Sequence, residues 1–185
     1  MSSMNKHRNR SITLLEAGLM SEQLSAVYDF MEHIMVLMNY AKDAELHKVL
    51  QRMLRQTGRR AEQLEKNLSE YNVALPPRPP VQVTITETPT SISDAYVFKR
   101  AFNSIVWFLP DQMFCFKFSP THNVRIMFKD LLLKELDMFE ELQRFGLRKK
   151  LVTGTTRIPR RASGYEREPD RYGSSSSLES PENQI

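Results

Sequence analysis

The chain has 185 residues, with 26 Lys and Arg, 22 Asp and Glu, and a formal net charge of +4. This length suits one domain with a sizeable core plus loose ends. The single cysteine excludes an internal disulfide framework and any metal site built from several thiolates. No run approaches the roughly 20 apolar residues that cross a bilayer. The basic first ten residues do not resemble a signal peptide, so we expect a soluble, intracellular protein.

Residues 1–12 are polar, and we expect them to be flexible. Thr13 and Glu16 have the spacing of a capping box at a helix N-terminus, and Gly18 leaves open whether a separate short helix starts there. Apolar residues three and four apart then predict a long helix over residues 21–41. Asp43 is the predicted N-cap of a second helix. So short a link makes these two helices an antiparallel hairpin.

The second helix combines an apolar seam with a charged face. The seam is interrupted at Thr57 and Gly58. The charged face is expected to meet solvent, and it consists of Lys48, Arg52, Arg55, Arg59, Arg60, Glu62, Glu65 and Lys66.

A proline-rich segment over residues 73–90 follows and then alternates apolar and polar residues, which predicts an extended strap rather than a helix. About eighteen extended residues span roughly 56 Å, whereas a helix of about 28 residues is roughly 42 Å long. The strap can therefore cross the whole bundle, with Val81, Val83 and Ile85 lying against it.

Ser91 or Ser93 is the predicted N-cap of a third helix that runs to about residue 118. Ser119 and Pro120 have the pattern of an N-cap and first position, and the fourth helix is expected to end near residue 149. Links that are short, long and short make the second and third helices parallel, which is the topology of ferritin-like bundles. The sequence therefore predicts an all-α, ferritin-like four-helix bundle over residues 13–151, with a Pro-rich crossover between helices 2 and 3. A disordered basic and polar tail is predicted over residues 152–185.

Ferritin-like bundles can hold two metal ions with one Glu from each of two helices and Glu-x-x-His from the other two. The weak candidates here are Glu62, Glu65 and Glu135, and none is followed by His at that spacing. Glu135 belongs either to the seam of the fourth helix or to its flank, where it would pair with Arg or Lys, and we favour the flank. Three histidines are expected at the surface or at helix ends: His33, His47 and His122. We expect no metal and no cofactor.

Other chemistry has little support in the sequence. No Gly-rich phosphate loop, nucleophile elbow or paired cysteine motif is present, and Cys115 is expected to be a buried, inert thiol. Basic residues that could bind an anion or an acidic partner lie on the second helix and after the fourth: Arg52, Arg55, Arg59, Arg148, Lys149 and Lys150. A solvated charged face and complementation of a helix dipole are the simpler interpretation.

The third helix has more aromatic residues than one seam of a monomeric bundle needs. They require a second burying surface, which either the strap or a second copy of the chain could supply. We favour the second copy and predict a homodimer. The interface candidates are Phe98, Phe102, Trp107, Phe108 and Phe114.

The Thr-x-x-Glu opening, the helical hairpin, the Pro-containing link, the aromatic third helix and the basic segment after the fourth helix resemble a known family. It is a ferritin-like domain-of-unknown-function family of spore-forming bacteria, related to the spore coat protein F family. The resemblance covers about residues 12–155. It implies a ferritin-like bundle, a non-enzymatic role and an association with sporulation, and it assigns no active-site residue. We expect a cytoplasmic or spore-associated location.

Three hypotheses about function remain. The leading one is a non-enzymatic structural or interaction protein, a dimeric bundle whose tails bind partners in a spore-related assembly. The second is an unusual ferritin-like metal-binding protein or oxidoreductase, which rests on topology and Glu135. The third is a binder of nucleic acid or an anionic surface through the basic segments, with steep salt dependence.

Overall fold

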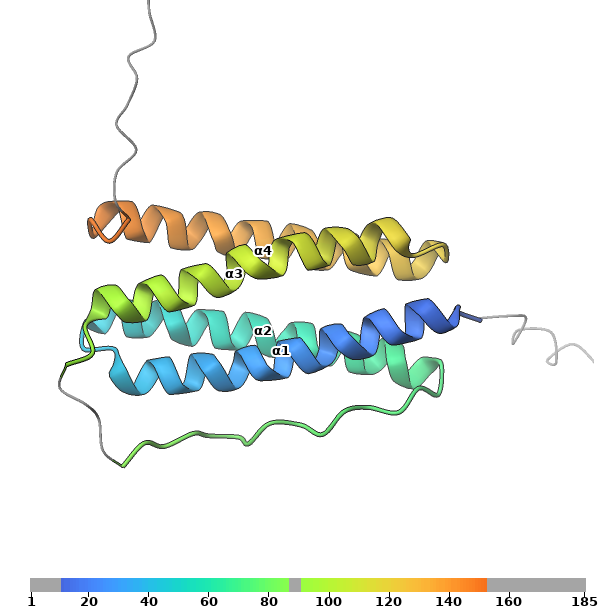
Figure 1. Ribbon diagram of the computed structural model, residues 1–185, viewed down its shortest axis with the longest axis horizontal. Coiled ribbons are helices and arrows are strands. Elements are labelled where there is room, and N and C mark those ends of the chain that lie inside the picture. The colour runs from blue at the N-terminus through green and yellow to red at the C-terminus, as the bar shows by residue number, and fades with distance from the viewer. Residues whose placement is uncertain (1–10, 87–90, 153–185) are drawn as a thin grey trace, which may run out of the picture. The chain divides into compact units, whose positions relative to one another are not determined.

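The computed structural model describes residues 11–86 and 91–152. These ranges hold four helices and no strand: α1 (Leu14–Tyr40), α2 (Ala44–Glu70), α3 (Asp94–Phe118) and α4 (His122–Arg148). α1 and α2 form one hairpin, α3 and α4 form the other, and α2 and α3 run in the same direction (Figure 1). The predicted all-α four-helix bundle with a long crossover is confirmed. Most of the predicted flexible N-terminus and of the predicted tail lies outside the described residues.

α1 is one continuous helix, so no separate short helix precedes it. Thr13 and Glu16 form the predicted capping box: the Thr13 Oγ1 accepts from the Glu16 amide at 3.2 Å, and Glu16 Oε2 accepts from the Thr13 amide at 2.9 Å. No helix in the described ranges has an apolar stretch long enough to span a membrane.

The Glu16 carboxylate also joins α1 to the start of α4. It accepts from the Thr121 amide at 2.7 Å and from the Thr121 hydroxyl at 2.8 Å. Thr121 is the N-cap of α4, because its carbonyl accepts from the Arg125 amide at 2.9 Å, and the prediction that Ser119 caps this helix is wrong. Ser119 instead ends α3, because its hydroxyl donates to the Cys115 carbonyl at 2.7 Å. Burial raises the pKa of Glu16, but the hydrogen bonds from Thr13 and Thr121 outweigh it and lower the pKa overall.

The described part of the crossover lies along α1 and α2, on the side away from α3 (Figure 1). The Asn39 side-chain amide donates to the Val83 carbonyl at 3.0 Å, and Arg78 forms an ion pair with Glu65. Val83 is partly buried, as predicted, but Val81 is 100% exposed, so the prediction that it packs on the bundle is wrong. The strap therefore does not cover the aromatic residues of α3.

The core consists of two apolar clusters along the bundle. One includes Ile34, Phe98 and Leu142, and the other includes Leu24, Leu64 and Phe128. Phe108 of α3 packs against both clusters, so it marks the level at which they meet.

Gly146→Ala should destabilise the fold by about 1–3 kcal/mol, because an added methyl group would overlap the Phe98 ring and the Val152 side chain. Gly18→Ala is the matched control. Its methyl group would meet no atom within 4 Å, so it should stabilise the helix by about 0.5–1 kcal/mol. Urea denaturation measures both changes. Equal effects at the two glycines would contradict the packing of Phe98 on Gly146.

Glu16→Gln should reduce the free energy of unfolding at pH 7 by about 1–3 kcal/mol, because the bonds from Thr13 and Thr121 favour the carboxylate. The folded pKa of Glu16 lies below the ordinary value of 4.5. Its stabilisation is therefore present above pH 4.5 and lost as the pH falls through the folded pKa. Urea denaturation should show that the difference in unfolding free energy between the wild type and Glu16→Gln is smaller at pH 3 than at pH 7. The control variant Glu32→Gln should have nearly the stability of the wild type at both pH values. A difference independent of pH would contradict this role.

Candidate interaction surface on α1 and α3

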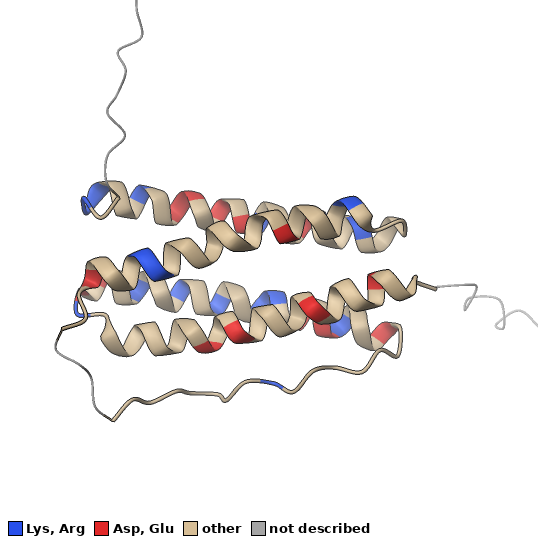
Figure 2. Cartoon of the chain, viewed as in Figure 1, with Lys and Arg blue, Asp and Glu red and all other residues tan. Residues whose placement is uncertain are grey.

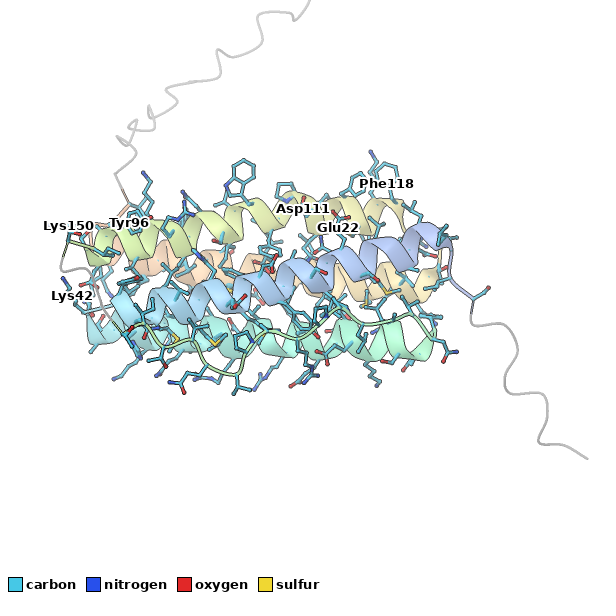
Figure 3. The ribbon with its side chains drawn as sticks, turned by 60° about the horizontal axis from the view of Figure 1, so that its bottom comes forward. Glu22, Lys42, Tyr96, Asp111, Phe118 and Lys150 are labelled. Carbon is cyan, nitrogen blue, oxygen red and sulfur yellow. The ribbon has the colours of Figure 1, made fainter. Side chains whose placement is uncertain are left out.

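Large apolar side chains line the outer side of α3. Trp107 is 76% exposed, which leaves most of the largest side chain in the protein in contact with water. Five other large apolar residues of α3 are also exposed: Tyr96, Val106, Met113, Phe114 and Phe118. We call these five residues and Trp107 the α3 outer face. Figure 3 shows Tyr96 and Phe118 near opposite ends of α3, with Asp111 between them. Such a concentration of apolar surface on one helix is typical of an interaction site.

The predicted interface residues separate into two groups. Phe98 is only 2% exposed and packs in the core against Phe145, so its assignment to an interface is wrong. Phe102 packs on Phe98 and on Phe139 of α4, and Phe108 packs on Phe30 of α1, which makes both mainly internal. Trp107 and Phe114 remain on the surface. The monomer therefore buries more aromatic rings of α3 than the sequence alone suggested.

A hollow of about 390 Å³ lies between α1 and α3 beside Trp107. Its titratable lining residues are Asp29 and His33 of α1 and Arg100 and Asp111 of α3. Burial lowers the pKa of His33, and the nearby Arg100 charge lowers it further. His33 Nε2 is buried without a hydrogen-bond partner among the described residues, so His33 is less a surface residue than predicted.

A second hollow of about 330 Å³ lies between α1 and α3, beyond Asp111. Glu22 and Asp111 contribute carboxylates to it, and Phe114 and Cys115 line its α3 side. Burial raises the pKa of the Cys115 thiol to about 12, with Asp111 and Glu22 adding to the effect. Because the thiolate is the reactive form of cysteine, this buried group is a poor nucleophile at neutral pH.

Charge is distributed unevenly between the two helices of the first hairpin. Figure 2 shows acidic residues along α1, which has four carboxylates and no Lys or Arg between Leu14 and Tyr40. α2 has an exposed basic row that includes Lys48, Arg55 and Arg59. Any partner that contacts α1 and α3 together therefore meets an acidic border beside the apolar α3 outer face.

Two pairs of inward polar residues form contacts between helices of the bundle. Arg60 of α2 and Glu135 of α4 form an ion pair, and they are 1% and 0% exposed. The Arg60 guanidinium also lies over the Phe108 ring, 5.2 Å from its centroid. Gln112 of α3 donates to Gln23 of α1 at 2.6 Å.

The placement of Glu135 on the helix flank is therefore wrong, although its pairing with an arginine is confirmed. The prediction that Arg60 lies in solvent is wrong as well. Each of the two charges can be buried because the other neutralises it. Burial raises the pKa of Glu135 and lowers that of Arg60, and their mutual attraction opposes both shifts. Atoms of both groups, including Glu135 Oε1 and Arg60 Nη2, are buried without a hydrogen-bond partner among the described residues.

The weak metal candidates do not converge. Glu62 is exposed, Glu135 is paired with Arg60, and Glu65 accepts from the Tyr28 hydroxyl at 2.5 Å beneath the strap residue Arg78. Glu65 was also expected in solvent, and its burial is explained by these two donors. Within residues 11–86 and 91–152, no three His, Cys, Asp or Glu side chains group closely enough to hold a metal ion. The side chains present do not fit a two-metal centre, which needs several inward carboxylates.

Half of the six predicted anion-binding residues form ion pairs within the chain. Arg52 lies 2.6 Å from Glu141, Arg148 lies 3.1 Å from Glu45, and Lys149 lies 2.8 Å from Asp43. Arg55, Arg59 and Lys150 are exposed and form no ion pair with a described residue. These six residues do not form a single site, because Arg148 to Lys150 lie at the end of α4 while Arg55 and Arg59 lie near the middle of α2.

No protein-family model and no curated protein sequence matches the chain. Solved structures do match its fold. A candidate spore coat protein from Bacillus halodurans aligns with a TM-score of 0.74 and 16% identity over 80% of this chain and 96% of its own.

Two further structures show the same arrangement. A two-domain protein from Anabaena variabilis with DJ-1/ThiJ/PfpI-like and ferritin-like domains aligns at a TM-score of 0.59 and 16% identity, over 78% of this chain and 40% of its own. A protein from Xanthomonas campestris aligns at a TM-score of 0.60 and 9% identity, over 74% of this chain and 91% of its own. At these identities the likeness shows a fold shared with ferritin-like bundles.

Removing either member of the buried ion pair should destabilise the bundle by about 3–5 kcal/mol, because Arg60→Met or Glu135→Leu leaves the other charge buried alone. The double variant removes both charges and should recover most of that loss. Chemical denaturation of the wild type and the three variants measures the coupling. Additive losses in the double variant would contradict a direct pairing of the two side chains.

Proposed function

We propose that this chain is a non-enzymatic structural or interaction protein that forms a homodimer through the α3 outer face and acts in a spore-related assembly. The observation that carries the proposal is the exposure of Trp107 among five other exposed apolar residues of α3. A monomer would leave this apolar surface in water at an unfavourable free energy. A second copy would remove it from water.

The chemistry of the interior supports a non-enzymatic role. Arg60 pairs with Glu135 and Gln23 with Gln112, so these four inward polar side chains bind each other. The Cys115 thiol is buried with a pKa of about 12. This arrangement favours the structural hypothesis over a ferritin-like oxidoreductase, and elemental analysis of the purified protein tests that choice. Iron, manganese or zinc near one equivalent or more per chain would overturn the non-enzymatic proposal.

The spore-related part of the proposal rests on fold similarity. The Bacillus halodurans protein that aligns over 96% of its length is a candidate spore coat protein, and the sequence resembles a family from spore-forming bacteria. Deletion of the gene in the source organism, followed by electron microscopy of spores and a lysozyme-resistance assay, tests this part. Spores with a wild-type coat and wild-type resistance would contradict it.

Trp107→Glu should weaken the dimer by about 30-fold or more, because a large aromatic anchor of an interface commonly contributes 2 kcal/mol or more and a charge would be desolvated in its place. Light scattering over a range of protein concentrations measures the dissociation constant. Leu133→Glu is the matched control, since Leu133 is also a large exposed side chain, 50% exposed, but on α4.

The control variant should associate like the wild type. If Trp107→Glu leaves the dimer unchanged while circular dichroism shows an intact fold, the α3 outer face is not the interface. Equal weakening by Leu133→Glu would also count against a specific role for α3.

A further inference from the structure

We propose that two copies of α3 pack antiparallel in the dimer, with a two-fold axis passing beside Trp107. This inference rests on the proposed homodimer and adds its register. It follows from the residues that occupy positions equally spaced before and after Trp107 on one face of α3.

Helical geometry selects those positions. At about 100° per residue, positions 4, 7 and 11 residues from Trp107 lie within about 40° of its direction. On the N-terminal side these positions are Asn103, Arg100 and Tyr96, and on the C-terminal side they are Asp111, Phe114 and Phe118. All six lie in α3, and none of them belongs to either core cluster.

A two-fold axis beside Trp107 makes each position face its counterpart in the second copy. Tyr96 then meets Phe118 of the second copy, which is an aromatic pair. Arg100 meets Phe114 of the second copy, which suits a cation–π contact, and it lies within one helical turn of Asp111 there. Asn103 meets Asp111, so an amide donor faces a carboxylate. These positions of α3 are therefore complementary to one another in charge and in the types of contact that they can form.

The parallel arrangement lacks this complementarity. It would place Arg100 opposite Arg100 and Asp111 opposite Asp111, and like charges across an interface are unfavourable. Neither Arg100 nor Asp111 has an ion-pair partner among the described residues, so no direct salt bridge within the described chain neutralises either charge. Charge thus favours the antiparallel register.

The hollow of about 390 Å³ lies next to the proposed axis, because Trp107 itself lines it. The Trp107 side chain of the second copy is the large apolar group nearest to that opening. The carboxylates of Asp29 and Asp111, which also line the hollow, can accept from an indole N–H. The acidic border of α1 would then take part in the interface along with α3.

Cysteine cross-linking tests the register. In a Cys115→Ala background, Asn103→Cys and Asp111→Cys variants are mixed under reducing conditions to exchange subunits and are then oxidised. The mixture should give at least tenfold more disulfide-linked dimer than either variant alone. In the proposed register Asn103 faces Asp111, whereas two copies of the same position lie about 12 Å apart along the helices, too far for a disulfide.

Light scattering of the same reduced samples separates this inference from the proposed function. A dimer that cross-links only in the mixture supports the register. A dimer that does not cross-link in the mixture, or that cross-links equally well in each single variant, overturns the register and leaves the homodimer standing. A monomer overturns both.

Discussion

The bundle depends on the buried ion pair between Arg60 and Glu135. Arg60 belongs to α2, Glu135 to α4, and the Phe108 ring beneath the guanidinium belongs to α3 and packs in turn on Phe30 of α1. One set of contacts thus joins all four helices where the two apolar clusters meet. A pair of apolar residues could give similar stability. The charged pair, however, fixes which faces of α2 and α4 turn inward, because neither charge can be buried without the other.

Because Arg60 and Glu135 pair inside the bundle, the surface of the protein is the better candidate for a functional site. A bundle of this topology could place reactive groups at its centre, but here the inward carboxylate is neutralised by an arginine of the same chain. The surplus apolar area lies instead on α3, which presents Phe98 to the core and Trp107 to the outside. The strap lies against the other hairpin, and it leaves the α3 outer face open to a second copy.

The helices and the crossover could be predicted from the sequence because local patterns determine them. The capping box of Thr13 and Glu16, the tight link before Asp43 and the proline-rich segment are each encoded within a few residues. The buried ion pair could not be predicted in the same way, since Arg60 and Glu135 lie 75 residues apart. The apolar stripe of α4 fits two helical frames, and only packing against α2 selects the one that buries Glu135. The amino-acid composition of α3 likewise did not show which of its aromatic rings, such as Phe98, point into the core and which, such as Trp107, remain exposed.

The mass of the unmodified full-length chain in solution tests the central claim most directly. Multi-angle light scattering at several micromolar concentrations should give twice the 21.6 kDa of one chain, with dissociation only on dilution. A mass of one chain at every concentration up to about 100 µM, where even weak complexes form, would contradict the account, because the α3 outer face would then remain exposed to water without a second copy to cover it.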